Sequence, residues 1–270
     1  MMQIFESWQA LLDTIRQRTI FRPWLGSLVL WLVILIATPI VLWTADASLF
    51  PLLATMGVLA QASASVLALS LAKPGRWLLR TLTVVVVCTW LVEFIGHRTG
   101  LPFGNYYYTE ALQPQLGGVP LLIPLAWLMM LAPAWGVTEI LLGERRNPLL
   151  FAAVAGLAFT AWDLYLDPQM VARGLWTWEQ PGAYFGIPWL NYLGWWLSAF
   201  LITLVVRPRQ LPTRPLLVIY TLTWAFQAIG QGLFWGQPGP ALAGFAGMGI
   251  FVLPAWRKVR ISTAHEDESR

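Results

Sequence analysis

Two pairs of ionisable residues stand at helical spacing within long apolar segments. Glu93 and His97 are four residues apart, and so are Asp163 and Asp167. A spacing of four places both members of a pair on one face of a helix, about one turn apart. An acid beside a second acid or a histidine can donate, accept or relay a proton, so the two pairs predict acid–base chemistry.

The expected depth of these residues in a membrane separates them from ordinary surface charges. Glu93 and Asp163 are expected roughly 20 Å from the inner side, at about 1.5 Å per residue, and His97 and Asp167 near the outer interface. Ionisable residues within membrane spans are functional candidates by default. The alternative for each is a structural contact between helices or solvation at the interface. We expect Asp163 and Asp167 to share a proton, which makes one of them a general acid.

Amides and aromatic residues are expected at the same depth or on the two long outer connections. Each amide by itself is usually a hydrogen bond between helices. The aromatic residues either form an interfacial belt or wall an apolar pocket and stabilise a cation with their π faces. The residues suggested for substrate binding are Asn105, Tyr106, Tyr107, Tyr108, Trp162, Trp176, Asn191, Gln227 and Gln231.

The composition indicates which elements must hold these residues. The chain of 270 residues is 57% hydrophobic and 11% charged, whereas soluble domains are about 25% charged. About 20 apolar residues in a helix span the hydrocarbon core. Eight segments qualify, at 24–43, 49–72, 77–97, 119–138, 149–167, 183–206, 215–236 and 239–256. The sequence therefore predicts an all-α integral membrane protein with about eight transmembrane helices.

The basic residues predict the orientation of the spans. Of the 17 lysine and arginine residues, all except Arg98 and Arg173 fall in alternate connections or at the chain ends. The positive-inside rule places that side in the cytoplasm, in a bacterial or archaeal cell membrane. We expect a cytoplasmic segment 1–23, one polytopic membrane domain 24–256 and a cytoplasmic tail 257–270. The net charge of +4 is assigned to this topology, and no nucleic-acid partner is expected.

An internal sequence similarity suggests that spans three–four and spans five–six are two copies of a parallel repeat. Each half has a Gly-x-Pro motif, at 118–120 and 186–188, followed at identical spacing by two leucines and a tryptophan, which are Leu122, Leu125, Trp127 and Leu190, Leu193, Trp195. Repeats of this kind are known in membrane proteins. The alternative is chance, since glycine and proline are common where helices begin.

Residue types that hold metals or cofactors are scarce. The sequence has two histidines and one cysteine, too few for a histidine-rich di-iron centre or a cysteine-rich metal site. It contains no phosphate-binding loop, zinc motif or serine-nucleophile elbow. We expect no metal and no cofactor.

Three segments together resemble the membrane-integral carotenoid biosynthesis family. They are EFIGHRTGLPFGNYYY at 93–108, GVP at 118–120 and WDLYLDP at 162–168. The similarity extends from about the third to the sixth span, and the first segment is long and unusual. The family includes carotenoid hydratases that act on γ-carotene, lycopene-like ends and bisanhydrobacterioruberin.

The resemblance implies a carotenoid 1,2-hydratase, a hydro-lyase that adds water across the terminal C1–C2 double bond of an acyclic end group. Its expected partners are a lipophilic carotenoid such as lycopene or γ-carotene, membrane lipid and other carotenoid enzymes. Protonation at C2 gives a tertiary cation at C1, and water then attacks it. We assign the acid to Asp163, tuned by Asp167, and the handling of water to Glu93 and His97. The roles of the two pairs are open to exchange.

Two other functions fit parts of the pattern. A carotenoid end-group cyclase or isomerase would use the same acid and cation while excluding water. A proton-coupled transporter would also use intramembrane acids and a repeat. Against a transporter, the ionisable residues gather near one side of the predicted membrane domain, with no polar path through its inner half.

Overall fold

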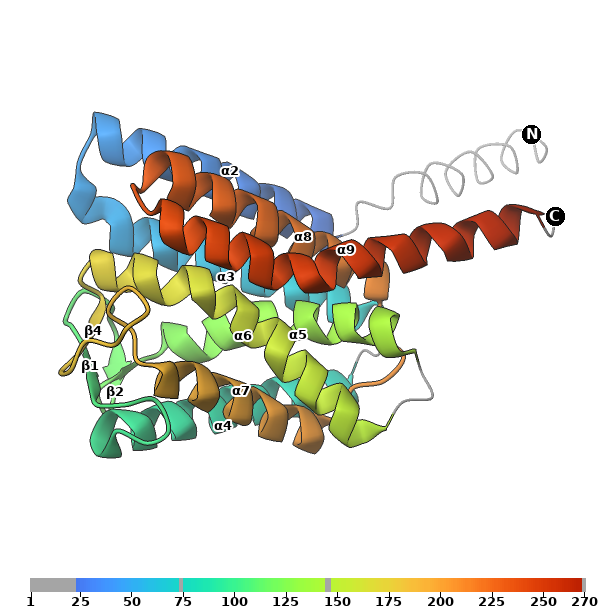
Figure 1. The fold of residues 1–270 in the computed structure, drawn as a ribbon, viewed down its shortest axis with the longest axis horizontal. Coiled ribbons are helices and arrows are strands. Elements are labelled where there is room, and N and C mark those ends of the chain that lie inside the picture. The colour runs from blue at the N-terminus through green and yellow to red at the C-terminus, as the bar shows by residue number, and fades with distance from the viewer. Residues whose placement is uncertain (1–22, 73–74, 144–146, 269–270) are drawn as a thin grey trace, which may run out of the picture.

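The protein is a bundle of long helices in the computed structural model, which describes residues 23–72, 75–143 and 147–268 (Figure 1). Eight of its helices are long and apolar enough to cross a membrane, which confirms the predicted fold class. The helical elements are α2 (Pro23–Thr44), the short η1 (Ala47–Leu49), α3 (Phe50–Ser70), α4 (Arg76–Thr99), α5 (Leu122–Leu142), α6 (Pro148–Ala172), α7 (Trp189–Val206), α8 (Thr213–Ile229), its π-helical continuation η2 (Gly230–Phe234) and α9 (Pro238–Glu268).

Several helix boundaries differ from the prediction, among them those of α5, α7 and α9. Helix α5 begins at Leu122 rather than at residue 119, because strand β3 (Val119–Pro120) first pairs with β2 (Gln115–Leu116). Helix α7 begins at Trp189 rather than at residue 183, because residues 182–187 fold back in a tight pair of bridges. Helix α9 continues beyond the predicted membrane boundary at residue 256.

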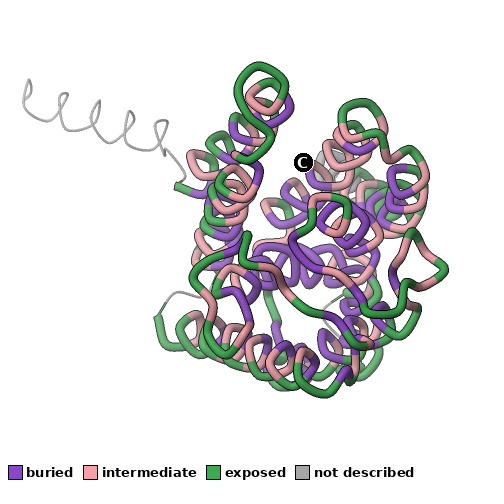
Figure 2. The backbone as a smooth tube through the Cα atoms, turned by 90° about the vertical axis from the view of Figure 1, so that its left-hand side faces the viewer, coloured by how far each residue is buried: buried purple, intermediate pink, exposed green. Residues whose placement is uncertain are grey.

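Helix α5 forms the centre of the bundle. It packs against α3, α4, α6, α8 and α9, and 78% of its most apolar stretch is buried, the highest share among the eight spans. In Figure 1, α2, α8 and α9 lie on one side of it and α4 and α7 on the other. Figure 2 looks along the bundle from the strand end and shows exposed residues on the outer helices. These outer surfaces are rich in leucine, isoleucine and valine, as lipid contact requires.

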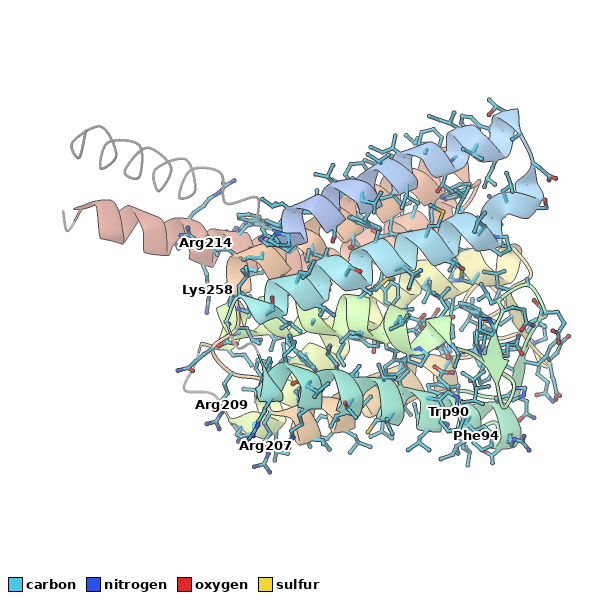
Figure 3. All side chains as sticks on the ribbon, turned by 180° about the vertical axis from the view of Figure 1, so that it is seen from behind. Trp90, Phe94, Arg207, Arg209, Arg214 and Lys258 are labelled. Carbon is cyan, nitrogen blue, oxygen red and sulfur yellow. The ribbon has the colours of Figure 1, made fainter. Side chains whose placement is uncertain are left out.

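Apart from Arg98 and Arg173, the described basic residues gather at the end of the bundle opposite the strands. Arg207, Arg209, Arg214 and Lys258 lie there, while Trp90 and Phe94 lie toward the strand end (Figure 3). This asymmetry agrees with the predicted topology. Seven of the basic residues used for the prediction lie outside the described residues, as does the N-terminal segment up to residue 22; they are Arg16, Arg18, Arg22, Lys73, Arg145, Arg146 and Arg270.

A short two-stranded ribbon joins the two long outer connections. Strand β1 (Tyr106–Tyr108) pairs antiparallel with β4 (Trp176–Trp178), and the central pair is Tyr107 with Thr177. Tyr107 stands fourteen residues after Glu93, and Thr177 stands fourteen residues after Asp163. An antiparallel pair centred on two equivalent positions is the arrangement that a local two-fold axis produces. The ribbon therefore favours the predicted duplication of spans three–four and five–six.

Candidate functional site

A small cavity of about 70 Å³ lies beneath this ribbon, among α3, α4, α5, α6 and α7. Its polar lining comes from two sides, one carrying Glu93 and the other Asp167 and Asn191. The rest of its wall is aromatic or aliphatic. The aromatic lining residues are Phe103, Tyr106, Tyr108, Trp127, Trp176, Trp178 and Trp195. A few polar groups in an apolar cavity are typical of a small-molecule site.

The Glu93 side chain is held by two tyrosine hydroxyls. Glu93 lies on α4 and is only 3% exposed. Its Oε2 accepts hydrogen bonds from Tyr106 Oη at 2.5 Å and Tyr108 Oη at 2.9 Å. Alternate residues of a strand point to the same face, so Tyr106 and Tyr108 face the carboxyl group while Tyr107 between them is exposed. The Tyr-Tyr-Tyr segment thus supplies two hydrogen-bond donors to one carboxyl group.

Both phenols are expected to stay neutral. Burial raises the pKa of Tyr106 well above its ordinary value, and the charges of Glu93 and then Asp167 raise it further. Burial, followed by the charge of Glu93, likewise raises the pKa of Tyr108. The two hydroxyls can therefore remain hydrogen-bond donors to Glu93 across the physiological pH range.

Asn191 bridges the two aspartates on the opposite side of the cavity. Asp163 and Asp167 are one turn apart on α6 and are both buried. The Asn191 amide, on α7, donates to Oδ2 of Asp163 at 3.0 Å and also to Oδ2 of Asp167. Trp176 Nε1 on β4 donates to Asp167 Oδ1 at 3.0 Å. The other oxygen of Asp163, Oδ1, receives no hydrogen bond from the described residues.

The two aspartates differ in their access to the cavity. Asp167 lines it, whereas Asp163 is fully buried behind it and is not part of its wall. A group that transfers a proton to a bound molecule must reach that molecule. The geometry therefore favours Asp167 over Asp163 as the group that faces a ligand.

Two stacked tryptophans form one wall of the cavity. The ring centroids of Trp127 on α5 and Trp195 on α7 are 4.9 Å apart with the ring planes inclined by 29°, and Phe159 stacks on Trp195 at 5.2 Å. Trp127 and Trp195 are the equivalent tryptophans of the two Gly-x-Pro repeats, so their contact again relates the two halves. We did not predict them as site residues, although both belong to the repeated motif in the sequence.

Several predicted site residues lie away from the cavity. His97 has its ring against the backbone of Gly118, where an added Cβ would be 2.5 Å from Nε2. Asn105 is exposed, and Gln231 is buried with its amide donating to the Tyr165 carbonyl at 2.6 Å. Trp162 and Gln227 line a second cavity beside the first. The members of the predicted set that line the first cavity are Glu93, Tyr106, Tyr108, Asp167, Trp176 and Asn191.

No metal-binding cluster of three or more histidine, cysteine, aspartate or glutamate side chains is found within residues 23–72, 75–143 and 147–268. Glu139 is a further buried acid on the described helices. It lies at the end of α5 away from the cavity. There its carboxylate accepts hydrogen bonds from the backbone amides of Gln210 and Leu211. This contact fixes the connection between α7 and α8 and is separate from the cavity.

Comparison with known proteins places this arrangement in a family. A bisanhydrobacterioruberin hydratase from Haloarcula japonica is 35% identical over 126 residues, which cover 46% of this chain and 43% of that protein. No solved structure matches the chain. The family described as "Carotenoid biosynthesis protein" matches residues 50–251, which include all the residues that line the cavity. The chain therefore belongs to the carotenoid biosynthesis protein family.

Proposed function

We propose that the protein is a carotenoid hydratase that adds water across the terminal C1–C2 double bond of an acyclic end group. The observation that carries the proposal is the pair of carboxyl groups, Glu93 and Asp167, facing one small aromatic cavity from different helices. Hydration of an isolated alkene needs an acid on one side and a base for water on the other. The relative from Haloarcula japonica bears the name of a hydratase, which supports this class of reaction.

The first step is transfer of a proton from Asp167 to C2 of the end group. The C1–C2 π electrons form the new C–H bond, which leaves a tertiary cation at C1 and a carboxylate at Asp167. Asn191 and Trp176 donate hydrogen bonds to that carboxylate and stabilise it as it forms. Our sequence-based assignment of the acid was Asp163; we now place the acid at Asp167 because it lines the cavity. Asp163 remains beside it, bridged to Asp167 by the Asn191 amide.

The cation at C1 is stabilised by the aromatic wall. Trp127 and Trp195 line the cavity from the helices, and Trp176 and Tyr108 line it from the ribbon. A desolvated cation within about 6 Å of a tryptophan face gains about 2 kcal/mol. This contribution is specific to the charged intermediate, so it lowers the barrier rather than tightening binding of the alkene.

The second step is attack of water on C1. Glu93, oriented by Tyr106 and Tyr108, accepts the proton that the water loses. The product is a tertiary alcohol, and the net change is the addition of one water with no oxidation or reduction. Return of a proton from Glu93 to the aspartate pair, through solvent, completes the cycle. His97 does not line the cavity, so we assign it to packing behind the tyrosines.

Expression in a host that makes an acyclic carotenoid tests the proposal. We expect a more polar product whose mass increases by one water, with its new oxygen taken from isotopically labelled water. A product of unchanged mass with a ring or a shifted double bond would instead identify a cyclase or isomerase. Unchanged pigments in cells that contain the membrane-inserted protein would refute hydration of those substrates.

A further inference from the structure

A second and larger cavity, about 410 Å³, adjoins the first. It is bounded by α2, α3, α6 and the region where α8 becomes η2. The two cavities share five lining residues, which are Ala54, Val58, Met129, Leu166 and Met170. We call this larger cavity the groove. A molecule lying in the groove would therefore have one end at the wall of the acid-lined cavity.

The groove is suited to a long hydrocarbon. Most of its lining is apolar, and two of its few polar side chains already have partners. Thr38 Oγ1 donates to the Ile34 carbonyl at 2.7 Å, and the Gln61 amide donates to Thr223 Oγ1 at 2.9 Å. Polar groups that are satisfied within the protein do not demand a polar ligand.

The groove has an open side between α2 and α8. Helix α2 packs along α3 and lacks comparable packing against α8. Residues of the groove on both helices are exposed, among them Ile36 and Ile40 on α2 and Ile229 on α8. At its outer end, the rings of Trp43 and Phe234 approach to 5.4 Å and bridge α2 to η2. Because all these helices are membrane spans, this open side faces the lipid acyl chains.

The groove is shorter than a polyene that spans the hydrocarbon core of a membrane. Its lining on α2 extends from Trp31 to Trp43, or roughly 18 Å at about 1.5 Å per residue. A polyene as long as the hydrocarbon core would measure about 30 Å. The groove can therefore hold about half of such a chain, and the remainder must leave through the open side.

We propose that the groove is the site for the substrate's polyene tail, which arrives from the bilayer between α2 and α8. One end group reaches the acid-lined cavity while the far half of the chain stays in lipid. The protein then acts on one end group at a time and does not bind the end group at the far end. This inference rests on the proposed hydratase function for its chemistry, and on the groove alone for its binding mode.

A binding assay tests the groove without relying on catalysis. Polyenes quench tryptophan fluorescence, and Trp31, Trp43, Trp162 and Trp235 line the groove. Titration of the detergent-solubilised protein with lycopene should give saturable quenching. Gly57→Phe should weaken binding at least tenfold, because Gly57 lines the groove and has room for a Cβ, with Ile34 Cγ2 at 3.9 Å.

Matched variants separate the groove from general damage and from catalysis. Leu59→Phe adds an aromatic ring to the exposed face of the same helix and should bind as the unmodified protein does. Asp167→Asn should also keep binding while losing product. Leu53→Trp fills the groove at a second point and should repeat the effect of Gly57→Phe. Unchanged affinity in both folded groove variants would overturn the proposal, whereas normal binding without any hydration would overturn only the proposed function.

Product order tests the single-ended binding mode. With a carotenoid that has two acyclic ends, the product hydrated at one end should be released and accumulate before the product hydrated at both ends. A carotenoid with a ring at the far end should react within about threefold of the same rate per open end. Formation of only the doubly hydrated product from the start, or rejection of the ringed substrate, would contradict the inference.

Discussion

Replacement of Asp167 by asparagine is the sharpest test of the site. The carboxyl group lines the cavity, and the amide is nearly the same size. The amide oxygen can still accept the hydrogen bond from Trp176 Nε1 that the structure shows at 3.0 Å. Because the amide cannot donate a proton in the way an acid does, the variant removes the chemistry and keeps most of the packing.

The expected loss is large for Asp167 and smaller for Asp163. A positioned general acid contributes about 10²–10⁴-fold, so Asp167→Asn should lower kcat by that factor. This corresponds to about 2.7–5.4 kcal/mol at 1.36 kcal/mol per decade. Asp163 does not line the cavity, and an amide there could still accept the hydrogen bond from Asn191. We expect Asp163→Asn to cost about tenfold, or about 1.4 kcal/mol.

The assay is hydration in membranes from cells that make each variant, with the alcohol quantified by mass against the amount of inserted protein. Glu139→Gln is the matched control. It also converts a buried carboxyl group to an amide, but Glu139 lies at the far end of α5 and contacts Gln210 and Leu211. It should keep normal activity per inserted protein. Full activity in Asp167→Asn, or a larger loss in Asp163→Asn, would refute the assignment of the acid to Asp167.

Four further predictions follow from individual contacts. Tyr108→Phe removes the 2.9 Å hydrogen bond to Glu93 and should lower kcat about tenfold with little change in KM, as measured with a short soluble isoprenoid that has the same end group; an unchanged kcat would argue against Glu93 as the base. Asn191→Leu leaves Asp163 and Asp167 without their shared donor and should destabilise the protein by about 1–3 kcal/mol, seen as a lower unfolding temperature in detergent. Gly118→Ala places a Cβ 2.5 Å from His97 Nε2 at a φ of +87° and should cost about 1–3 kcal/mol of stability, whereas Gly143→Ala, also at positive φ but in open space, should cost less. Since burial raises the pKa of Tyr106 above its ordinary value of 10.0, the unfolded state loses its proton first, so stability should be level up to about pH 10 and fall above it; Tyr106→Phe should reduce that fall, and an equal slope in both proteins would contradict it.

The fold was largely predictable because hydrophobicity along the chain determines which segments enter a membrane. The spans containing Glu93 and Asp163 were found although both residues are ionisable, since a single charge shifts the mean hydropathy of a long segment only slightly. The residues at which α5 and α7 begin could not be predicted from hydrophobicity. Val119 and Ile187 are apolar in either structure, and only their partners in β3 and in the bridge at Tyr184 decide that they are not helical.

The acidic residues of the site could be predicted from the sequence, whereas the residues that line the cavity could be predicted only in part. Spacing along a helix identifies the face shared by Asp163 and Asp167, but it does not reveal which of them meets the cavity. That depends on how α6 is rotated against α7, where Asn191 lies between the two carboxyl groups. His97 shares a face with Glu93 in the same way, yet its ring lies against the backbone of Gly118 and does not line the cavity.

The ribbon of β1 and β4 sets a requirement on how the two halves can have diverged. Its central pair, Tyr107 and Thr177, joins equivalent positions, so two identical halves would present the same group to both carbons of a double bond. Two identical carboxyl groups can divide one proton between them and so act as acid and base, but in identical halves both would have the same side-chain partners. In the predicted tandem repeat, each half can change alone and so acquire partners of its own. Here one half holds Glu93 between phenols, and the other holds Asp167 against an amide and an indole.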